Sequence, residues 1–392
     1  MTLLTSPALP VDAGTLCLAN ARLILRDEVV RGALHMRDGR IARIETGAAV
    51  PPGAIDCSGD YLLPGLVELH TDNLEKHLMP RTGVLWPALP ALLAHDAQLL
   101  AAGITTALLA LSLGDLEHDS VRTTTLTDSL AALTRAHANG LLRAEHFLHL
   151  RCELAYPQLP QLLDACAGYV QLRLVSLVDH TPGQRQYRDV EQYRRYYARS
   201  GMRWNEVEFS QLLDARAAQQ RRYREAHLAA ACAFAQRAGA GLASHDDTDA
   251  AHIDEACAVG ATIAEFPTTL AAARAARAAG LAIVAGAPNL VRGGSHAGNV
   301  AAIELARADC LDVLSSDYQP ASLLHGAFLL HEQAGWTLPR AIATITHAPA
   351  RVLGFDDRGE IVPGRRADLL RVHTIDALPV VKQVWLRGEQ TY

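Results

Sequence analysis

Two residues with metal-ligating side chains stand at the end of an apolar run near residue 70. The run from Tyr61 to Leu69 is almost wholly apolar, and it is followed by His70 and, two positions later, Asp72. Alternate residues of a strand point to one side, so both side chains should leave the carboxyl end of this strand toward one point. An imidazole and a carboxylate aimed at one point favour a metal ion, although a His-x-Asp pair alone also occurs as a purely structural feature.

Other predicted strands also end in residues of this kind. These strand-end groups are Glu153, Asp179 with His180, His245 with Asp246 and Asp247, and Asp317. Each Asp taken singly could instead cap the helix that follows its strand. Their coincidence at one end of several strands favours a common site, and nitrogen and oxygen ligands with room for a water molecule suit a hydrolytic metal centre.

The middle of the chain must supply the strands that position these groups. Short apolar stretches alternate there with longer Ala- and Leu-rich stretches of helical period, which favours a parallel sheet wrapped by helices. The predicted strands are Leu66–His70, Ile104–Ala110, His146–Cys152, Tyr169–Leu177, Gly241–His245, Thr262–Phe266, Ala282–Ala285 and Val313–Ser316. Eight such strands fit an α/β fold of the (β/α)₈ TIM barrel type, with an open doubly wound sheet as the alternative.

Both ends of the chain instead alternate short β-like runs with turns. Asp38-Gly39 is a hairpin turn signal between two such runs, and the last forty residues show the same pattern. We therefore expect a small β-sandwich domain built from residues 1–62 and 350–392, with residues 63–349 forming the barrel.

Composition limits the classes of function. The 392 residues carry a net charge of −6, which argues against a wholly basic protein held to nucleic acid. The seven cysteines include no Cys-x-x-Cys pair, and no export signal is visible at the start. We expect a cytoplasmic protein without a nucleic-acid or membrane partner, and the sequence leaves open whether it forms a homo-oligomer.

Several motifs together resemble the amidohydrolase superfamily of metal-dependent hydrolases. They are the flanking β segments, residues 64–70, 103–106 and 364–369, the histidines after middle strands, and Ser316-Asp317. The similarity covers nearly the whole chain. It implies a TIM barrel enzyme that uses a metal-activated water.

Four longer segments narrow the resemblance to the PhnM family, the diphosphatases of the bacterial carbon–phosphorus lyase pathway. These segments are residues 70–77, 179–187, 244–248 and 286–296. The resemblance implies hydrolysis of a small phosphorylated sugar, α-D-ribose 1-methylphosphonate 5-triphosphate, to the 5-phosphate and diphosphate. The superfamily's usual first motif is His-x-His, and here Asp72 replaces the second imidazole with an oxygen ligand, which makes the site harder and more anionic.

The resemblance also assigns roles to individual residues. The implied metal ligands are His70, Asp72, Glu153, His180, His245 and Asp317. They would hold divalent metal, expected as two ions, and zinc, manganese and iron are not distinguished. Asp317 would accept the proton of the attacking water, and His296 or His77 would assist the leaving group.

A triphosphate also needs fixed cations, and basic residues lie close to the motifs. These are Lys76, His77, Arg81, Arg185, Arg188 and Arg292. A guanidinium suits phosphate through its bidentate fork, so we predict that this set binds the substrate phosphates. For each residue singly, the alternative is an ordinary solvated loop charge.

Two other functions compete with this prediction. A C–N bond hydrolase, such as a deacetylase or a cyclic amidase, would use the same barrel and leave the surplus of arginines near the motifs unexplained. A scaffold protein that has lost its metals would lack ligands at the strand ends, whereas His70, His180, His245 and Asp317 are all present.

Overall fold

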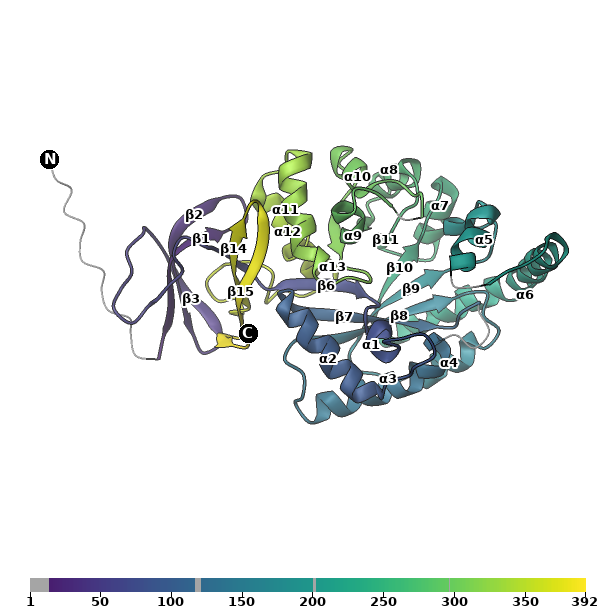
Figure 1. The fold of residues 1–392 in the computed structure, drawn as a ribbon, viewed down its shortest axis with the longest axis horizontal. Helices are drawn as coiled ribbons and strands as arrows, with labels where there is room; N and C mark the ends of the chain where they lie inside the picture. The colour runs from purple at the N-terminus through teal and green to yellow at the C-terminus, as the bar shows by residue number, and fades with distance from the viewer. Residues whose placement is uncertain (1–13, 117–120, 200–201, 296) are drawn as a thin grey trace.

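The computed structural model describes residues 14–116, 121–199, 202–295 and 297–392. It consists of a barrel and a smaller β domain that lies at one side of it (Figure 1). The helical elements all belong to the stretch between residues 74 and 352. They are α1 (Leu74–Leu78), α2 (Ala88–Ala101), α3 (Val121–Ala138), α4 (Leu159–Ala165), η1 (Arg185–Tyr187), α5 (Val190–Arg199), α6 (Glu206–Ala238), α7 (Ala250–Ala258), α8 (Leu270–Ala278), α9 (Ala287–Val291), α10 (Ala302–Arg307), α11 (Ser322–Ala334), α12 (Leu338–Ala343) and α13 (His347–Val352).

Eight parallel strands follow one another around the barrel in chain order. They are β6 (Leu66–Thr71), β7 (Ile104–Leu113), β8 (Glu145–Glu153), β9 (Leu172–Val178), β10 (Gly241–His245), β11 (Ile263–Glu265), β12 (Ala282–Gly286) and β13 (Val313–Ser315). A parallel bridge between Thr71 and Asp317 joins the first strand to the last. The predicted (β/α)₈ barrel is confirmed, because an open sheet would leave these two strands at opposite edges.

The barrel interior is filled by one apolar side chain from each strand. This layer consists of Leu69, Leu108, Phe147, Leu174, Ala243, Ile263, Val284 and Val313. Val352 and Phe355, at the end of α13 and just after it, pack against the layer. The barrel is therefore a packed core rather than a pore, and polar groups collect where the strands end.

The small domain is one hydrogen-bonded sheet made from both ends of the chain. Its strands are β1 (Leu16–Ile24), β2 (Val29–Arg37), β3 (Arg40–Thr46), β4 (Ile55–Asp56), β5 (Tyr61–Pro64), β14 (Leu369–Ile375), β15 (Leu378–Leu386) and β16 (Glu389–Gln390). The antiparallel pair β5 and β14 joins the two ends of the chain. The fully buried Trp385 packs with Leu18, Leu34 and Leu62 in the core of this domain.

The two domains share a backbone connection and a cluster of charges. Glu145, the first residue of β8, accepts hydrogen bonds of 2.5 Å from both Arg358 and Arg366, which lie between α13 and β14. The expected boundary between residues 62 and 63 falls inside β5, and the one at residue 350 falls inside α13. The expected boundaries therefore fall within a strand of the small-domain sheet and within a helix that packs against the barrel strand β6.

Gly65 turns the chain from the small domain into the barrel. A Cβ atom at this position would lie 2.2 Å from Oγ1 of Thr105, at the start of β7. Only glycine allows this close approach, which brings β6 against β7.

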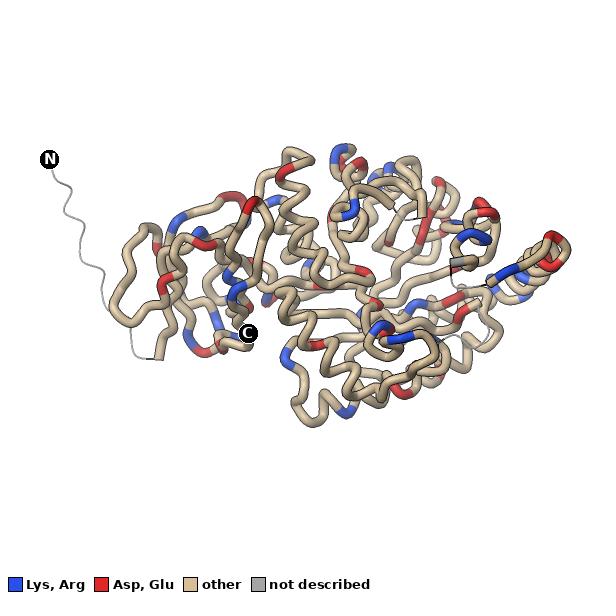
Figure 2. The backbone as a smooth tube through the Cα atoms, viewed as in Figure 1, with Lys and Arg blue, Asp and Glu red and all other residues tan. Residues whose placement is uncertain are grey.

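Charge is distributed evenly over the molecule. Acidic and basic residues are interspersed along both domains (Figure 2). Within the described part of the chain, no helix combines the length and the apolar character that crossing a membrane requires.

Candidate metal centre and active-site pocket

A cavity of about 350 Å³ opens at the carboxyl ends of the barrel strands. It is the place where most of the strand-end groups meet. The acidic, basic and histidine side chains that line it are His70, Asp72, Glu75, Lys76, Asp115, Arg122, Arg151, His180, His245, Asp246, Arg292 and Asp317.

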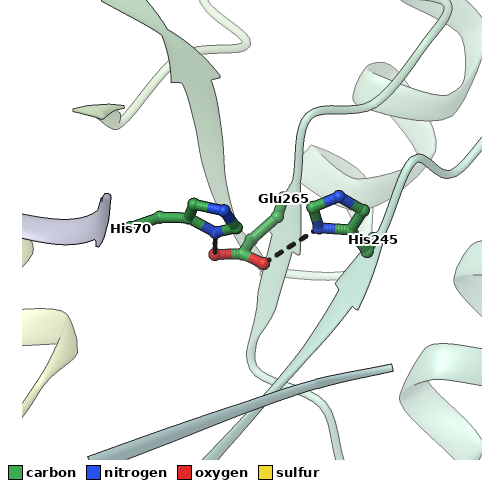
Figure 3. A group of neighbouring side chains, drawn as sticks. All are labelled: His70, His245 and Glu265. Carbon is green, nitrogen blue, oxygen red and sulfur yellow. Dashed lines mark hydrogen bonds and ion pairs between the residues drawn. The ribbon is translucent and has the colours of Figure 1, made fainter. Parts of the chain in front are cut away.

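His70 and His245 come from different strands and are held by the same carboxylate. Glu265 lies between their rings (Figure 3), with its Oε1 3.0 Å from Nδ1 of His70 and its Oε2 3.1 Å from Nδ1 of His245. Ser176 donates a further hydrogen bond of 2.5 Å to Glu265. Burial works against ionisation of Glu265, but the neighbouring imidazoles of His70, His149 and His245 hold its pKa well below the usual range.

His180 is held in the same way by a second carboxylate. Its Nδ1 lies 2.9 Å from Oε2 of Glu153, and its backbone N–H also points at this carboxylate. Burial raises the pKa of Glu153. Glu153 thus lies behind His180 and is not among the residues that line the pocket.

The donor set fits a divalent cation. In His70, His180 and His245 the Nδ1 atom donates to a buried carboxylate, which leaves Nε2 as the acceptor atom for a metal, a common arrangement around bound cations. Two groups of side chains have ligand atoms that all lie within 4.8 Å of one another inside each group. The first is His70, His245 and Glu265, and the second is His180, His245 and Asp246. Both groups contain His245.

Asp72 and Asp317 meet where the barrel closes. The backbone oxygen of Asp317 accepts hydrogen bonds from Asp72 N, at 3.2 Å, and from Oγ1 of Thr71, at 3.0 Å. Burial and the nearby charge of Asp72 raise the pKa of Asp317 to about 7. Burial would also raise the pKa of Asp72, but Arg151 and Arg122, 3.3 and 4.0 Å from its Oδ2, bring that pKa below the ordinary value.

The predicted phosphate-binding residues divide into two groups. Lys76 and Arg292 line the pocket, and both are exposed. Arg81, Arg188 and His77 are outside the pocket lining, and the His77 ring instead lies 2.8 Å from Gln98.

Arg185 is also outside the lining. It is buried, bonded to Asp247 at 2.5 Å, and donates to the backbone oxygen of His245 at 2.8 Å, so it supports a ligand strand. His296, the predicted aid to the leaving group, lies outside the described residues.

Three important residues were not predicted from the sequence. Glu265 and Arg151 lie inside predicted strands. A charged residue within such an apolar run is the sequence feature that could have identified each of them. Arg122 lies on α3 and contacts Glu75 at 2.9 Å. No strand-end pattern marks it.

The fixed charges of the pocket do not suit an anion by themselves. Five carboxylates line it, those of Asp72, Glu75, Asp115, Asp246 and Asp317, against four cations, Lys76, Arg122, Arg151 and Arg292. A strongly anionic substrate would be repelled unless divalent cations shift this balance. The charges of the pocket therefore suit an anionic substrate that binds together with divalent cations.

Comparison with known proteins gives one relative over nearly the whole chain. The α-D-ribose 1-methylphosphonate 5-triphosphate diphosphatase of Escherichia coli strain K12 is 42% identical over 375 residues, which cover 95% of this chain and 99% of the relative. A dihydroorotase of Methanopyrus kandleri is 34% identical over 94 residues, 20% of this chain and 22% of that protein. No protein-family model matches the chain.

Solved structures share the fold at low sequence identity. N-isopropylammelide isopropylaminohydrolase from Burkholderia multivorans has a TM-score of 0.63 at 20% identity, covering 96% of this chain and 97% of that chain. The 5-methylcytosine deaminase from Klebsiella pneumoniae has a TM-score of 0.64 at 17% identity, and the match covers 96% of this chain and 97% of the deaminase chain. N-acetylglucosamine-6-phosphate deacetylase from Pasteurella multocida has a TM-score of 0.61 at 14% identity, with 96% and 99% covered.

Proposed function

The chain belongs to the family of the α-D-ribose 1-methylphosphonate 5-triphosphate diphosphatase, within the amidohydrolase superfamily, and from this membership we propose that it catalyses that reaction. The substrate is cleaved by water to α-D-ribose 1-methylphosphonate 5-phosphate and diphosphate, a step of phosphonate catabolism in the cytoplasm. The similarity to the diphosphatase, 42% identity over 95% of this chain, carries this proposal. The mixed charges of the pocket support it.

Some residues of the site bind the metal ions directly, and others orient the ligands. We assign His70, His180, His245, Asp72 and Asp317 as metal ligands for two divalent ions, with Glu153 and Glu265 orienting the imidazoles. When bound, such ions lower the pKa of water and neutralise charge on the phosphoryl oxygens.

The chain's own groups then move the proton and hold the substrate. Asp317, which lines the pocket, takes the proton of the attacking water. Lys76 and Arg292, exposed at the pocket, hold the outer phosphates of the triphosphate. Attack occurs at the α-phosphorus, and diphosphate leaves.

An isotope experiment tests both the reaction and the bond that breaks. Metal-loaded protein is incubated with the ribosyl triphosphate in H₂¹⁸O, and the products are identified by ³¹P NMR. We expect ¹⁸O in the sugar 5-phosphate and none in the diphosphate. Label in the diphosphate would place the attack at the β-phosphorus, and release of orthophosphate alone would contradict the proposal.

A matched assay separates the C–N hydrolase alternative. The same preparation is offered N-acetylated sugars and cyclic amides, the substrate classes of the deacetylase and amidase activities considered above. Turnover of an amide without cleavage of the triphosphate would replace the diphosphatase proposal.

A further inference from the structure

We propose that Arg151 is a catalytic residue that holds a non-bridging oxygen of the phosphoryl group under attack. The proposal rests on the function proposed above and adds to it a residue that strand-end reasoning did not select. It also gives Asp72 a second task, since Asp72 is the carboxylate that holds this guanidinium in place.

Arg151 is buried at the pocket rather than exposed at its rim. It lies on β8, its side chain is only 9% exposed, and it lines the same cavity as His70, His245 and Asp317. The two other cations that we assign to the substrate, Lys76 and Arg292, are exposed. The position of Arg151 therefore matches the reacting end of the triphosphate, and those of Lys76 and Arg292 match its outer phosphates.

The hydrogen bonds of Arg151 leave donor capacity in the pocket. One nitrogen, Nη1, donates to Oδ2 of Asp72 at 3.3 Å. The buried Nε–H of Arg151 has no hydrogen-bond partner among the described residues. No hydrogen bond of Nη2 is found among the described residues either. Because Arg151 lines the cavity, an oxygen that enters the cavity meets a guanidinium whose donors are not all used.

The chemistry of a guanidinium selects a phosphoryl oxygen as that acceptor. Its planar fork matches phosphate oxygens, which accept its N–H groups in a bidentate arrangement. In phosphoryl transfer, negative charge spreads over the equatorial oxygens of the group that is transferred. A fixed donor in a site that excludes water stabilises this charge without needing to reorganise.

Arg151 lies among the proposed metal ligands. It lines the same cavity as His70, His245 and Asp317, and it hydrogen-bonds to Asp72. Arg122 approaches the same oxygen of Asp72, with Nη2 4.0 Å from Oδ2, and contacts Glu75 at 2.9 Å. Asp72 thus pairs with two guanidiniums.

The test compares Arg151→Gln with Arg274→Gln, which removes an exposed charge on α8 outside the pocket. Kinetic constants and metal content are measured for both variants. Arg151→Gln should lower kcat by about 100- to 1000-fold with a smaller change in KM and with wild-type metal content, and Arg274→Gln should match the wild type. A wild-type kcat in Arg151→Gln, or a loss of metal in proportion to activity, would overturn the proposal.

Two further measurements separate contact with substrate from a structural role. Added guanidinium ion should restore part of the activity of Arg151→Ala, because the small cation can fill the space and supply the missing donors. Failure of guanidinium to restore any activity in a folded, metal-loaded Arg151→Ala would count against the proposal. Arg151→Lys, which keeps the charge and loses the fork, should recover less than half of the wild-type kcat, and full recovery would refute bidentate recognition.

Binding of ribose 5-phosphate keeps this proposal distinct from the proposed function, because its single phosphate stands for the phosphoryl group that remains on the sugar. Calorimetry on metal-loaded protein should show an affinity for ribose 5-phosphate that falls about tenfold or more in Arg151→Gln, as expected for the loss of one charged hydrogen bond. If the wild type fails to cleave the ribosyl triphosphate, the proposed function is wrong, and this affinity alone decides the role of Arg151. Equal affinity in both proteins would overturn the role of Arg151 while leaving the function standing.

Discussion

At the scale of single residues, the pocket is organised by carboxylates that orient imidazoles. Glu265 accepts from Nδ1 of both His70 and His245, so one side chain fixes the tautomer and the direction of two rings on different strands. Glu153 does the same for His180. The orientation of all three rings therefore depends on two buried acids.

Replacement of Glu265 by Gln tests this dependence. The amide keeps the size of the side chain but presents N–H groups to one ring, which reverses that hydrogen bond and favours the wrong tautomer. We expect Glu265→Gln to lower metal affinity by about 10- to 100-fold, measured by competition with a coloured chelator. Glu332→Gln, on the exposed face of α11, is the control and should bind metal like the wild type.

Two results would contradict this prediction. Wild-type metal affinity in Glu265→Gln would show that the histidines orient themselves without the carboxylate. An equal loss in both variants would show that the effect is not specific to the pocket.

The sequence predicts the site residues that stand at strand ends, but it does not predict those whose place depends on side-chain direction or on the order of the strands. A strand that ends at His70, His245 or Asp317 marks its own last residues, and the structure brings these three into one pocket. Proximity along the chain does not give the direction of a side chain, so Arg185 was predicted to face substrate and instead bonds to Asp247. Arg151 joins the site only because β8 pairs with β7, which in turn pairs with β6, and no local pattern reveals this order of strands.

At the scale of elements, each predicted barrel strand is present in the structure, but the first or the last residue of most of them differs from the prediction. Gly241–His245 was predicted with its observed bounds, because its apolar run is flanked by a clear start and a polar end. The strand predicted from Tyr169 begins instead at Leu172, whose backbone N–H bonds to the oxygen of Tyr169 in a turn. The β-like composition of this turn could not be distinguished from that of the strand.

The close approach of β6 and β7 at Gly65 is a property of these elements that can be tested. A Cβ at this position would lie 2.2 Å from Oγ1 of Thr105, so Gly65→Ala must displace one strand. We expect the variant to lose about 1–3 kcal/mol of unfolding free energy, seen as a lower midpoint in chemical denaturation.

A second substitution provides the control for this strain. Thr105→Ala removes the hydroxyl and methyl groups that the new Cβ would meet, so the double variant should recover part of the lost stability. Gly65→Ala that is as stable as the wild type would show that β6 and β7 can separate without cost.

At the scale of the whole molecule, a cluster of charges links the barrel to the small domain. Glu145 on β8 accepts from Arg358 and Arg366, and Arg366 also pairs with Asp368 at 2.7 Å. Burial works against ionisation of Glu145, but the hydrogen bond from Arg366 and the charge of Arg358 bring its pKa below the ordinary value of 4.5. The linkage therefore depends on an ionised carboxylate.

This linkage predicts how stability responds to acid. Since the folded-state pKa of Glu145 is depressed, its contribution is fully present above pH 4.5 and is lost as the pH falls through the folded-state value. Glu145→Gln should therefore cost about 1.5–3 kcal/mol at pH 7, and the gap in thermal midpoint between variant and wild type should narrow only below pH 4.5.

The control for this prediction is Glu28→Gln, which removes an exposed charge from the small domain. It should leave the midpoint within experimental error of the wild type at both pH values. A gap for Glu145→Gln that stays constant from neutral to acidic pH would show that its ionisation does not support the linkage.

The bridge between Thr71 and Asp317 also determines the earliest time at which the pocket can form during translation. These two residues are 246 positions apart, and the pocket needs both of them in place. At roughly 5–20 residues per second, translation of that interval takes roughly 12–50 s. His70 and Asp72 leave the ribosome long before their partner strand exists, so the complete pocket forms only in the finished chain.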